Sequence, residues 1–169
     1  LNNILPIDSY SNNLLDHKLI IPADSLLGNS KPTAVYQAWK DNKPVAVAFS
    51  VIAPDGYSGD IRLLIAIKAS GKISGVRVIS HKETPGLGDK IDVAKDQWIL
   101  GFNEKSLDDP NVKQWKVKKD GGVFDQFTGA TITPRAVVKA VYKALDYYNH
   151  NQQRLFLNQT EYDQLYGQK

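Results

Sequence analysis

The sequence predicts an α+β fold, in which an antiparallel β-sheet is covered by flanking helices. Strand-like runs rich in branched apolar residues follow one another between residues 33 and 80. Ser70-Gly71-Lys72 separates the last two runs, and so short a turn joins antiparallel neighbours. The most regular helical pattern comes later, between residues 134 and 149. Strands that precede a helix, instead of alternating with helices, favour an α+β domain with antiparallel pairing.

Residues 1–32 are rich in Asn, Ser and Leu, and we expect an irregular lead-in with a short helix near residues 12–17. Residues 33–149 then form the main domain. Asp55-Gly56 and Ser58-Gly59 mark a loop between two of its strands. The expected strands cover residues 33–39, 44–53, 61–69 and 73–80.

The second half of this domain is expected to mix loops with shorter elements. Residues 93–102 predict a helix, because Trp98 and Phe102 lie four residues apart and share one face. Residues 115–119 predict a strand, which ends in a turn at Asp120-Gly121-Gly122.

Residues 134–149 form the clearest predicted helix. We expect Pro134 as its first residue and Thr133 as its N-cap. The polar residues 150–169 are expected to form a docked or frayed C-terminal tail. Four apolar residues recur at spacings of four, four and three, which predicts a stripe that packs in the core: Val137, Val141, Leu145 and Tyr148.

Composition narrows the class of protein. The 169 residues carry a net charge of +3, with basic and acidic residues interspersed, so we expect no nucleic-acid partner. The chain has no cysteine, which excludes disulfides and iron–sulfur ligation by its own residues. The longest apolar run, residues 45–53, is about half of the roughly 20 residues that a spanning helix needs.

The segment Asp125-Gln-Phe-Thr-Gly-Ala-Thr-Ile-Thr-Pro-Arg135 carries the strongest functional signal. It brings three threonine hydroxyls, those of Thr128, Thr131 and Thr133, directly before the predicted helix. Backbone amides at a helix N-terminus attract phosphate, and Gly129 lets a bulky anion approach the main chain closely. An ordinary capped turn has the same residue types. The wider pattern is more specific than such a turn.

The pattern Asp125-x-x-Thr-Gly-Ala-Thr131 resembles the signal that bacterial flavin transferases recognise in covalently flavinylated proteins. Three further segments match in the same order along the chain, and the whole match covers about residues 33–149. They are Ala53-Pro-Asp-Gly-Tyr-Ser-Gly59, His81-Lys-Glu-Thr-Pro-Gly-Leu-Gly-Asp-Lys-Ile91 and Lys118-Lys-Asp-Gly-Gly122. The chain thereby resembles the RnfG (or RsxG) subunit of the Rnf electron-transport complex, whose FMN-binding domain is shared with the NqrC subunit of the sodium-pumping NADH:quinone oxidoreductase.

The resemblance implies an electron-transfer flavoprotein whose FMN is attached to Thr131 through a phosphoester. Thr128, Gly129 and Ala130 then belong to the cofactor loop. Lys119, beside Lys118, either neutralises the FMN phosphate or is simply solvated. Thr131 serves as the attachment residue and not as a catalytic residue, and no metal ligands are expected.

The resemblance also implies the partners and the location of the protein. A flavin transferase attaches the FMN, and the other Rnf subunits surround the mature protein. The complex couples electron flow between NADH and ferredoxin to ion transport. The resemblance further implies a removed N-terminal membrane helix and a domain on the periplasmic side of the bacterial inner membrane. The absence of methionine fits a trimmed chain.

The segment from residue 83 to residue 88 predicts contacts to the flavin ring. Pro85 stiffens this loop, and its two glycines let the backbone approach a flat ligand without an intervening Cβ. Tyr57 could stack on the ring, and His81 is more often a structural residue than an acid or base in such a loop. The expected contacts are Leu87 as an apolar cover, Gly86 and Gly88 beside the ring, and Glu83 and Thr84 as polar partners.

Three alternatives stay open at this point. An NqrC-like subunit shares the domain and the tether. A binding module could hold a phosphate-bearing ligand without a covalent bond. A threonine-nucleophile hydrolase is the least favoured, because Thr131 is not N-terminal and no base is paired with it in the sequence. No Gly-x-Gly-x-x-Gly loop is present, so we expect no NADH oxidation by this chain alone.

Overall fold

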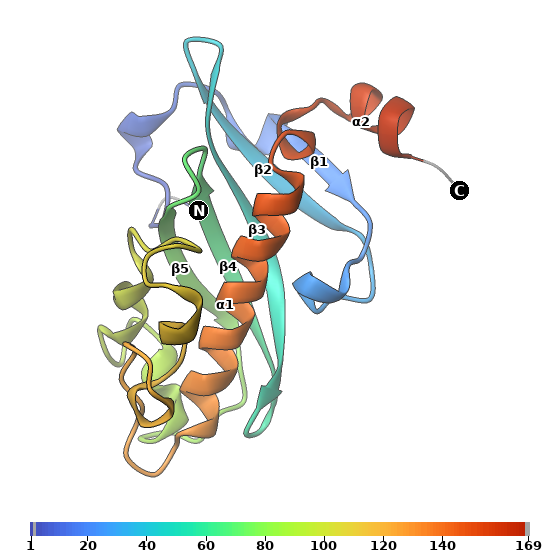
Figure 1. Ribbon diagram of the computed structural model, residues 1–169. Helices are drawn as coiled ribbons and strands as arrows, with labels where there is room; N and C mark the ends of the chain where they lie inside the picture. Colours follow the sequence, from blue (N-terminus) through green and yellow to red (C-terminus); the bar gives the residue numbers. More distant parts are fainter. Residues whose placement is uncertain (2, 168–169) are drawn as a thin grey trace.

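The computed structural model describes residues 1 and 3–167. Its centre is a five-stranded antiparallel sheet in which each strand pairs with the next along the chain (Figure 1). This arrangement confirms the predicted α+β class. The strands are β1 (Lys18–Ile21), β2 (Thr33–Lys40), β3 (Lys43–Gly56), β4 (Gly59–Lys68) and β5 (Ile73–Ser80).

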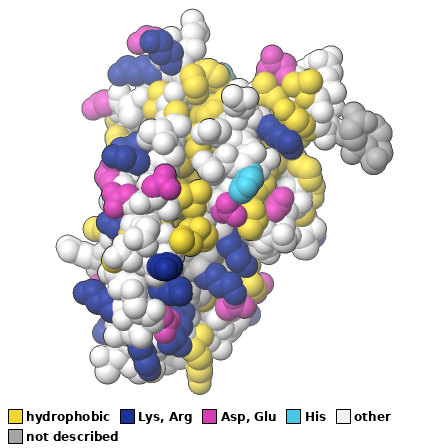
Figure 2. All heavy atoms as spheres, in the orientation of Figure 1, with side chains coloured by type: hydrophobic (Ala, Val, Ile, Leu, Met, Phe, Trp, Pro, Cys, Tyr) yellow, Lys and Arg dark blue, Asp and Glu magenta, His cyan; other side chains and the backbone are white. Residues whose placement is uncertain are grey.

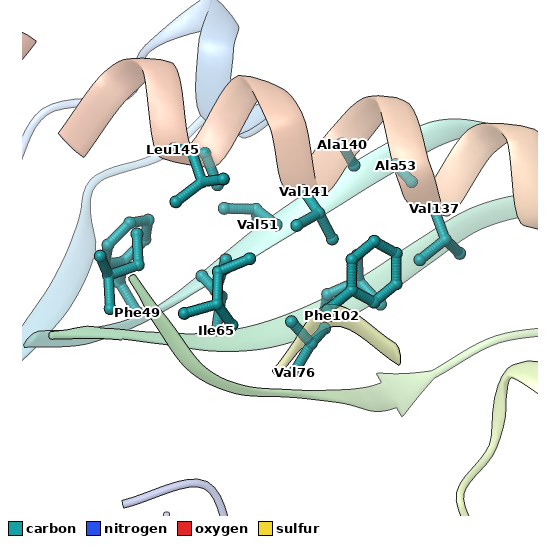
Figure 3. Packing of buried hydrophobic residues seen from close by; sticks show 14 of the residues in the cluster. Phe49, Val51, Ala53, Ile65, Val76, Phe102, Val137, Ala140, Val141 and Leu145 are labelled. Carbon is teal, nitrogen blue, oxygen red and sulfur yellow. The ribbon is translucent and has the colours of Figure 1, made fainter. Parts of the chain in front are cut away.

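The long helix α1 (Ile132–Asn151) lies across one face of the sheet, as Figure 1 shows. Its predicted apolar stripe is confirmed, since Val137, Val141 and Leu145 are buried against strands β3 and β4 (Figure 3). Burying side chains of this size contributes about 1.5–3 kcal/mol each. The helix is therefore held to the sheet mainly by apolar contact along its length.

The opposite face of the sheet is covered by the N-terminal segment. Ile4 and Leu5 are buried there against alanines of β2, β3 and β4. A Cβ added at Gly75 would lie 2.8 Å from Ile4, so the segment packs closely on β5. Small side chains on this face let an irregular segment take the place of a second long helix.

The described residues include one further α-helix, α2 (Gln159–Tyr166), near the C-terminus. Asn158 and Glu161 cap it reciprocally, and the Gln159 side chain bonds both backbone groups of Ile20, at 2.8 and 3.3 Å. The polar tail is thus docked on edge strand β1. Short 3-10 helices cover Ile7–Ser9, Leu14–Asp16, Ser25–Leu27, Gly88–Ile91, Trp98–Phe102, Val112–Gln114, Lys118–Asp120 and Arg154–Phe156.

The expectation of an irregular lead-in was wrong at β1, and the helix predicted near residues 12–17 is a single 3-10 turn at Leu14–Asp16. Strand β1 has only four residues, with alternating exposed and buried side chains. Two alternations are too few to stand out from a loop in sequence. Pairing with β2 is what makes this segment a strand.

The helix predicted over residues 93–102 was also wrong in its first half. Only Trp98–Phe102 is helical, as a 3-10 turn. The carboxylates of Asp92 and Asp96 each accept a hydrogen bond from the backbone N–H two residues ahead, at 3.0 and 2.9 Å. Such local bonds offer the backbone an alternative to the α-helix.

The strand predicted over residues 115–119 does not form. Val117 makes only an isolated bridge with Phe124, and the chain turns back at Lys118–Asp120. The apolar residues of this segment belong instead to an aromatic cluster, in which Trp115 stacks on Phe102 with ring centroids 6.1 Å apart. Core packing, and not strand pairing, therefore accounts for the burial of Trp115 and Val117.

Candidate functional site

The threonine-rich segment before α1 and the loop of residues 83–88 meet in one pocket at the N-terminal end of α1. The pocket has a volume of about 230 Å³. The hairpin tip between β3 and β4 closes it, so three segments far apart in the sequence lie side by side at the lower end of the molecule in Figure 1. Its lining residues are Tyr57, Thr84, Leu87, Gly88, Gly129, Ala130, Thr131, Ile132 and Thr133.

A buried carboxylate joins these three segments. Glu83 is 5% exposed, and its two oxygens accept hydrogen bonds from the backbone N–H groups of Tyr57, at 3.0 Å, and Ser58, at 2.8 Å. The hydroxyl of Thr133 donates to the same carboxylate. We call these contacts the Glu83 network. It fixes the hairpin tip, the loop after β5 and the first turn of α1 against one another.

Glycine is required at position 88 by this network. A Cβ there would lie 2.7 Å from the Thr133 hydroxyl oxygen and 2.9 Å from the Glu83 Cβ. Gly88 therefore lets the loop and the helix pack, and it also lines the pocket, where its expected contact with a flat ligand stays a prediction. Gly86 has φ +80°, and its N–H donates to the carboxylate of Asp89 at 2.9 Å. A left-handed backbone favours glycine at this position, and the contact of Gly86 with the flavin stays a prediction.

Thr131 is the N-cap of α1, and its side chain makes no capping hydrogen bond. It is partly exposed in the pocket wall. The residue before the cap follows a tight turn, since Gly129 has φ +78° and the N–H of Ala130 donates to Phe127 at 3.2 Å. The Thr131 hydroxyl thus lies in the pocket wall without a capping role.

The predicted start of α1 was wrong by two residues. The helix begins at Ile132, so Thr133 is not the N-cap and Pro134 is the third helical residue. Thr133 is 1% exposed because its hydroxyl belongs to the Glu83 network. Proline is tolerated at the third position, since N–H groups in the first turn have no partner within the helix.

Charged side chains near the pocket are largely paired with one another. Arg135 donates two hydrogen bonds of 2.7 Å to Asp120. This pairing lowers the pKa of Asp120 and raises the pKa of Arg135. Lys139 lies 3.2 Å from Asp55. The positive charge that the sequence places at the start of α1 is thus partly neutralised.

The acidic residue that opens the transferase motif also has a partner. Asp125 lies 2.8 Å from Lys118, and its carbonyl accepts a hydrogen bond from the Trp98 ring nitrogen at 2.8 Å. Lys119 is exposed and outside the pocket lining, and its backbone N–H donates to the Gln126 side chain at 3.1 Å. These contacts hold the loop that precedes α1.

The pocket brings together six of the ten residues expected to bind the cofactor: Thr84, Leu87, Gly88, Gly129, Ala130 and Thr131. It leaves four outside its lining: Glu83, Gly86, Thr128 and Lys119. Glu83 lies behind the wall and supports it, whereas Thr128 is exposed on the approach to Thr131. That these residues contact FMN stays a prediction.

Two large apolar residues of the pocket wall were not among the ten residues expected to bind the cofactor. Tyr57 is 71% exposed and Ile132 is 46% exposed, and both lie beside Leu87, which is 40% exposed. Large apolar side chains seldom gather at a polar helix end without a ligand or partner. The position of Tyr57 between two turn glycines is the one signal that pointed to it.

The wall fits a ligand that joins a flat apolar ring to a phosphate. Tyr57, Leu87 and Ile132 supply the apolar surface. The N-terminus of α1 supplies backbone N–H groups and the positive end of the helix dipole. Within the described range no group of three or more His, Cys, Asp or Glu side chains is arranged to hold a metal. Across the same residues, no helix is both long enough and apolar enough to span a membrane.

The class of protein is shown by a match to a known family of domains. A family model described as "FMN-binding domain" matches residues 56–146, which include the hairpin tip, the loop after β5 and most of α1. The chain therefore contains an FMN-binding domain, in agreement with the character of the pocket.

The particular family follows from curated relatives that are each named as the G subunit of an ion-translocating oxidoreductase complex. The relative from Shewanella loihica is 51% identical over 92% of this chain and 73% of its own length. Those from Vibrio cholerae and Pseudomonas aeruginosa are 52% and 53% identical, over 92% and 90% of this chain and 74% and 71% of their own lengths. The chain belongs to this family, the G subunits of Rnf-type ion-translocating oxidoreductase complexes. This confirms the resemblance read from the motifs.

Proposed function

We propose that this protein carries FMN bound covalently to Thr131 through a phosphoester and relays electrons within the complex. One observation carries the proposal: of the three threonines in the motif, Thr131 alone both completes the transferase pattern and lies in the pocket wall with a hydroxyl that has no capping role. Thr128 lies outside the wall, and Thr133 is buried on Glu83. FMN supplies the redox chemistry when bound, while the chain anchors and orients it.

The first turn of α1 suits the phosphate of the tether. The N–H groups of Ile132 and Thr133 lie in the first helical turn, where no intrahelical acceptor exists, and Pro134 has no N–H. A phosphate at this position gains from both amides and from the helix dipole. Arg135 and Lys139 are held by carboxylates, so the backbone is the better source of phosphate contacts.

The apolar wall residues suit the ring. Tyr57 and Ile132 offer exposed surface beside the anchor, and Leu87 approaches a Cβ position of Gly129 to 3.5 Å. Thr84 adds a hydroxyl at the rim of the same pocket. These side chains would limit the orientation of the ring and exclude water from one side of it.

Attachment requires an external enzyme, since a threonine hydroxyl is a poor nucleophile without a base. The Thr131 oxygen would attack the phosphorus of the FMN half of FAD. A new P–O bond forms, the pyrophosphate P–O bond breaks, AMP leaves, and the hydroxyl proton passes to a base of the flavin transferase. Asp125, paired with Lys118, serves as a recognition residue in this scheme.

We extend the proposal to the complex that contains the protein and to the side of the membrane on which the domain lies. The relatives are named as subunits of ion-translocating complexes, and we assign the chain to a complex that couples electron flow between NADH and ferredoxin to ion transport. We place the domain on the periplasmic side of the bacterial inner membrane, held by an N-terminal helix. A fixed cofactor suits that side, because free FMN would be lost there.

Intact-mass spectrometry after co-expression with a flavin transferase tests the tether. We expect one FMN phosphoester on the parent chain and on Thr131→Ser, which keeps the hydroxyl. Thr131→Val removes only the hydroxyl, and we expect it to fold without FMN. A parent chain that stays unmodified, while the transferase modifies a known acceptor, would leave a non-covalent phosphate site as the function.

A further inference from the structure

A second and larger hollow runs along α1 on the side of residues 112–120. Its volume is about 660 Å³, against about 230 Å³ for the pocket at Thr131. No residue is shared between the two linings. We call it the α1 groove. It is lined by Leu26, Val112, Trp115, Lys116, Val117, Asp120, Arg135, Val138, Lys139, Tyr142, Lys143 and Asp146.

The floor of the α1 groove is apolar and closely packed. Trp115 is 5% exposed, Val138 is 2% exposed, and the Trp115 and Tyr142 rings lie with centroids 5.7 Å apart. Val112 is 57% exposed at the rim. A recess walled by packed aromatic rings suits a single large apolar side chain from a partner, the usual centre of a protein interface.

The rim of the α1 groove is positively charged. Four lining residues are cationic, namely Lys116, Arg135, Lys139 and Lys143, and two are acidic, namely Asp120 and Asp146. Lys and Arg side chains gather over the lower part of α1 and the adjoining loops (Figure 2).

Existing ion pairs leave part of this charge without a partner. Asp120 is held by Arg135, and Asp146 lies 3.2 Å from the His150 ring. Among the described residues, Lys116 and Lys143 are in no salt bridge within 4.0 Å. Charge on the two sides of a protein interface is usually complementary, so these lysines favour a partner segment that carries carboxylates.

The α1 groove begins close to the proposed FMN anchor. The lining residues of α1 follow one another at spacings of three, one, three, one and three, from Arg135 to Asp146, and so form one helical face. Arg135 lies four residues after Thr131, which is about 6 Å along a helix axis. A partner seated in the groove would therefore lie beside the redox site without filling it.

We propose that the α1 groove docks an acidic segment of another subunit of the complex, with one aromatic or aliphatic side chain inserted over Trp115 and Tyr142. A lipid surface would satisfy the cations but would leave the recess unfilled. A second copy of this chain, docked by the same face, would place positive charge against positive charge. The proposal does not depend on how FMN is bound.

Site-specific photo-crosslinking in the assembled, purified complex tests the proposal. The photoreactive amino acid p-benzoylphenylalanine replaces Val112 at the groove rim and, for comparison, Lys43, the exposed first residue of β3. Crosslinked peptides are identified by mass spectrometry. We expect position 112 to crosslink to a segment of another subunit that has net negative charge and an apolar residue, and position 43 not to crosslink to that segment.

Reversing the charge of Lys116 and Lys143 tests whether the crosslink depends on charge complementarity. Lys116→Glu with Lys143→Glu should lower the crosslink yield from position 112 about tenfold, and raising salt should lower it in the parent, because both weaken the same complementarity. Lys31→Glu with Lys43→Glu, at exposed positions outside the groove, should leave the yield unchanged. Equal FMN content and equal unfolding midpoints would show that the variants fold.

Four outcomes would overturn the docking proposal. They are a crosslink from position 112 to a neutral or basic segment, to a second copy of this chain, or to lipid, and the absence of any crosslink in a complex shown to be fully assembled. None of these would bear on the tether at Thr131, which the mass measurement tests separately.

Discussion

The two ends of α1 are held to the protein by different forces. The C-terminal half is fixed by buried apolar and aromatic side chains, among them Leu145, Tyr147 and Tyr148. The N-terminal turn also buries Pro134, and it adds polar contacts through Glu83 and the Arg135–Asp120 pair. Apolar burial stabilises the whole domain, whereas a few directional hydrogen bonds set the shape of the pocket. Changes at the two ends should therefore have separable consequences.

The largest effect is expected in the apolar half of α1. Leu145→Ala removes a fully buried side chain packed over the sheet, and should cost about 2–5 kcal/mol of unfolding free energy. Urea denaturation gives this value. The folded fraction should still accept FMN, because the change lies far along α1 from Thr131. A folded variant that accepts no FMN would contradict the separation of the two ends.

Glu83→Gln should disturb the pocket with a smaller loss of stability. The amide keeps the size of the carboxylate but turns an NH₂ group toward a hydrogen-bond donor of the Glu83 network, which costs about 1–3 kcal/mol. Hydrogen exchange should accelerate at the Tyr57 and Ser58 amides while the β3–β4 amides stay protected. Glu104→Gln, at an exposed surface pair, is the control. Uniform loss of protection would mean that the network supports the whole fold.

Tyr148→Phe should cost about 1 kcal/mol, because it removes the hydrogen bond that the hydroxyl donates to the Ala69 carbonyl at 3.0 Å. Burial raises the pKa of Tyr148 to about 12 from its usual 10.0. The folded state therefore holds this proton more tightly than the unfolded state does. Stability from this group is full below pH 10 and declines as the pH rises from 10 toward 12.

The alkaline decline can be measured as the unfolding midpoint against pH. The parent should lose stability between pH 10 and pH 12, and Tyr148→Phe should lose less over the same interval. Burial also raises the pKa of Tyr147, so part of the slope should persist in the variant. An unchanged slope would show that Tyr148 does not titrate as its burial predicts.

The smallest effect on stability is expected at the exposed Arg135–Asp120 pair, which lines the α1 groove. Asp120→Asn removes the charge that binds Arg135, and should shift the unfolding midpoint less than Tyr148→Phe does. Since the pKa of Asp120 is lowered in the folded state, its contribution is present above the usual carboxylate pKa and is lost as the pH falls below it. A midpoint difference between parent and variant that persists at pH 2 would contradict this assignment.

Long, regular patterns were sufficient to predict the central fold. The four longer strands and α1 were each found within a few residues, because several turns or alternations of pattern agree there. Strand β1 was missed because four residues carry too little pattern. The errors in residues 93–102 and 115–119 arose where Asx turns and aromatic packing decide the backbone.

Most residues that line the pocket could be predicted from the sequence, whereas the geometry that supports them could not. The motifs selected residues from two of the three segments that line the pocket, including Thr131. They could not indicate that Glu83 is a buried support, or that Thr133 is its partner, because that contact joins residues 50 positions apart. Nor could they reveal that Ile132 completes the wall, since its role depends on α1 starting at that residue.

The central claim is that Thr131 carries FMN, and peptide mapping of the native flavinylated protein tests it most directly. Proteolysis followed by fragmentation in the mass spectrometer distinguishes the three threonines of the motif. The account predicts the flavin phosphate on Thr131 alone, because Thr128 lies outside the pocket and Thr133 is buried. Flavin phosphate on Thr128 or Thr133, or flavin that is released whole on denaturation, would contradict it.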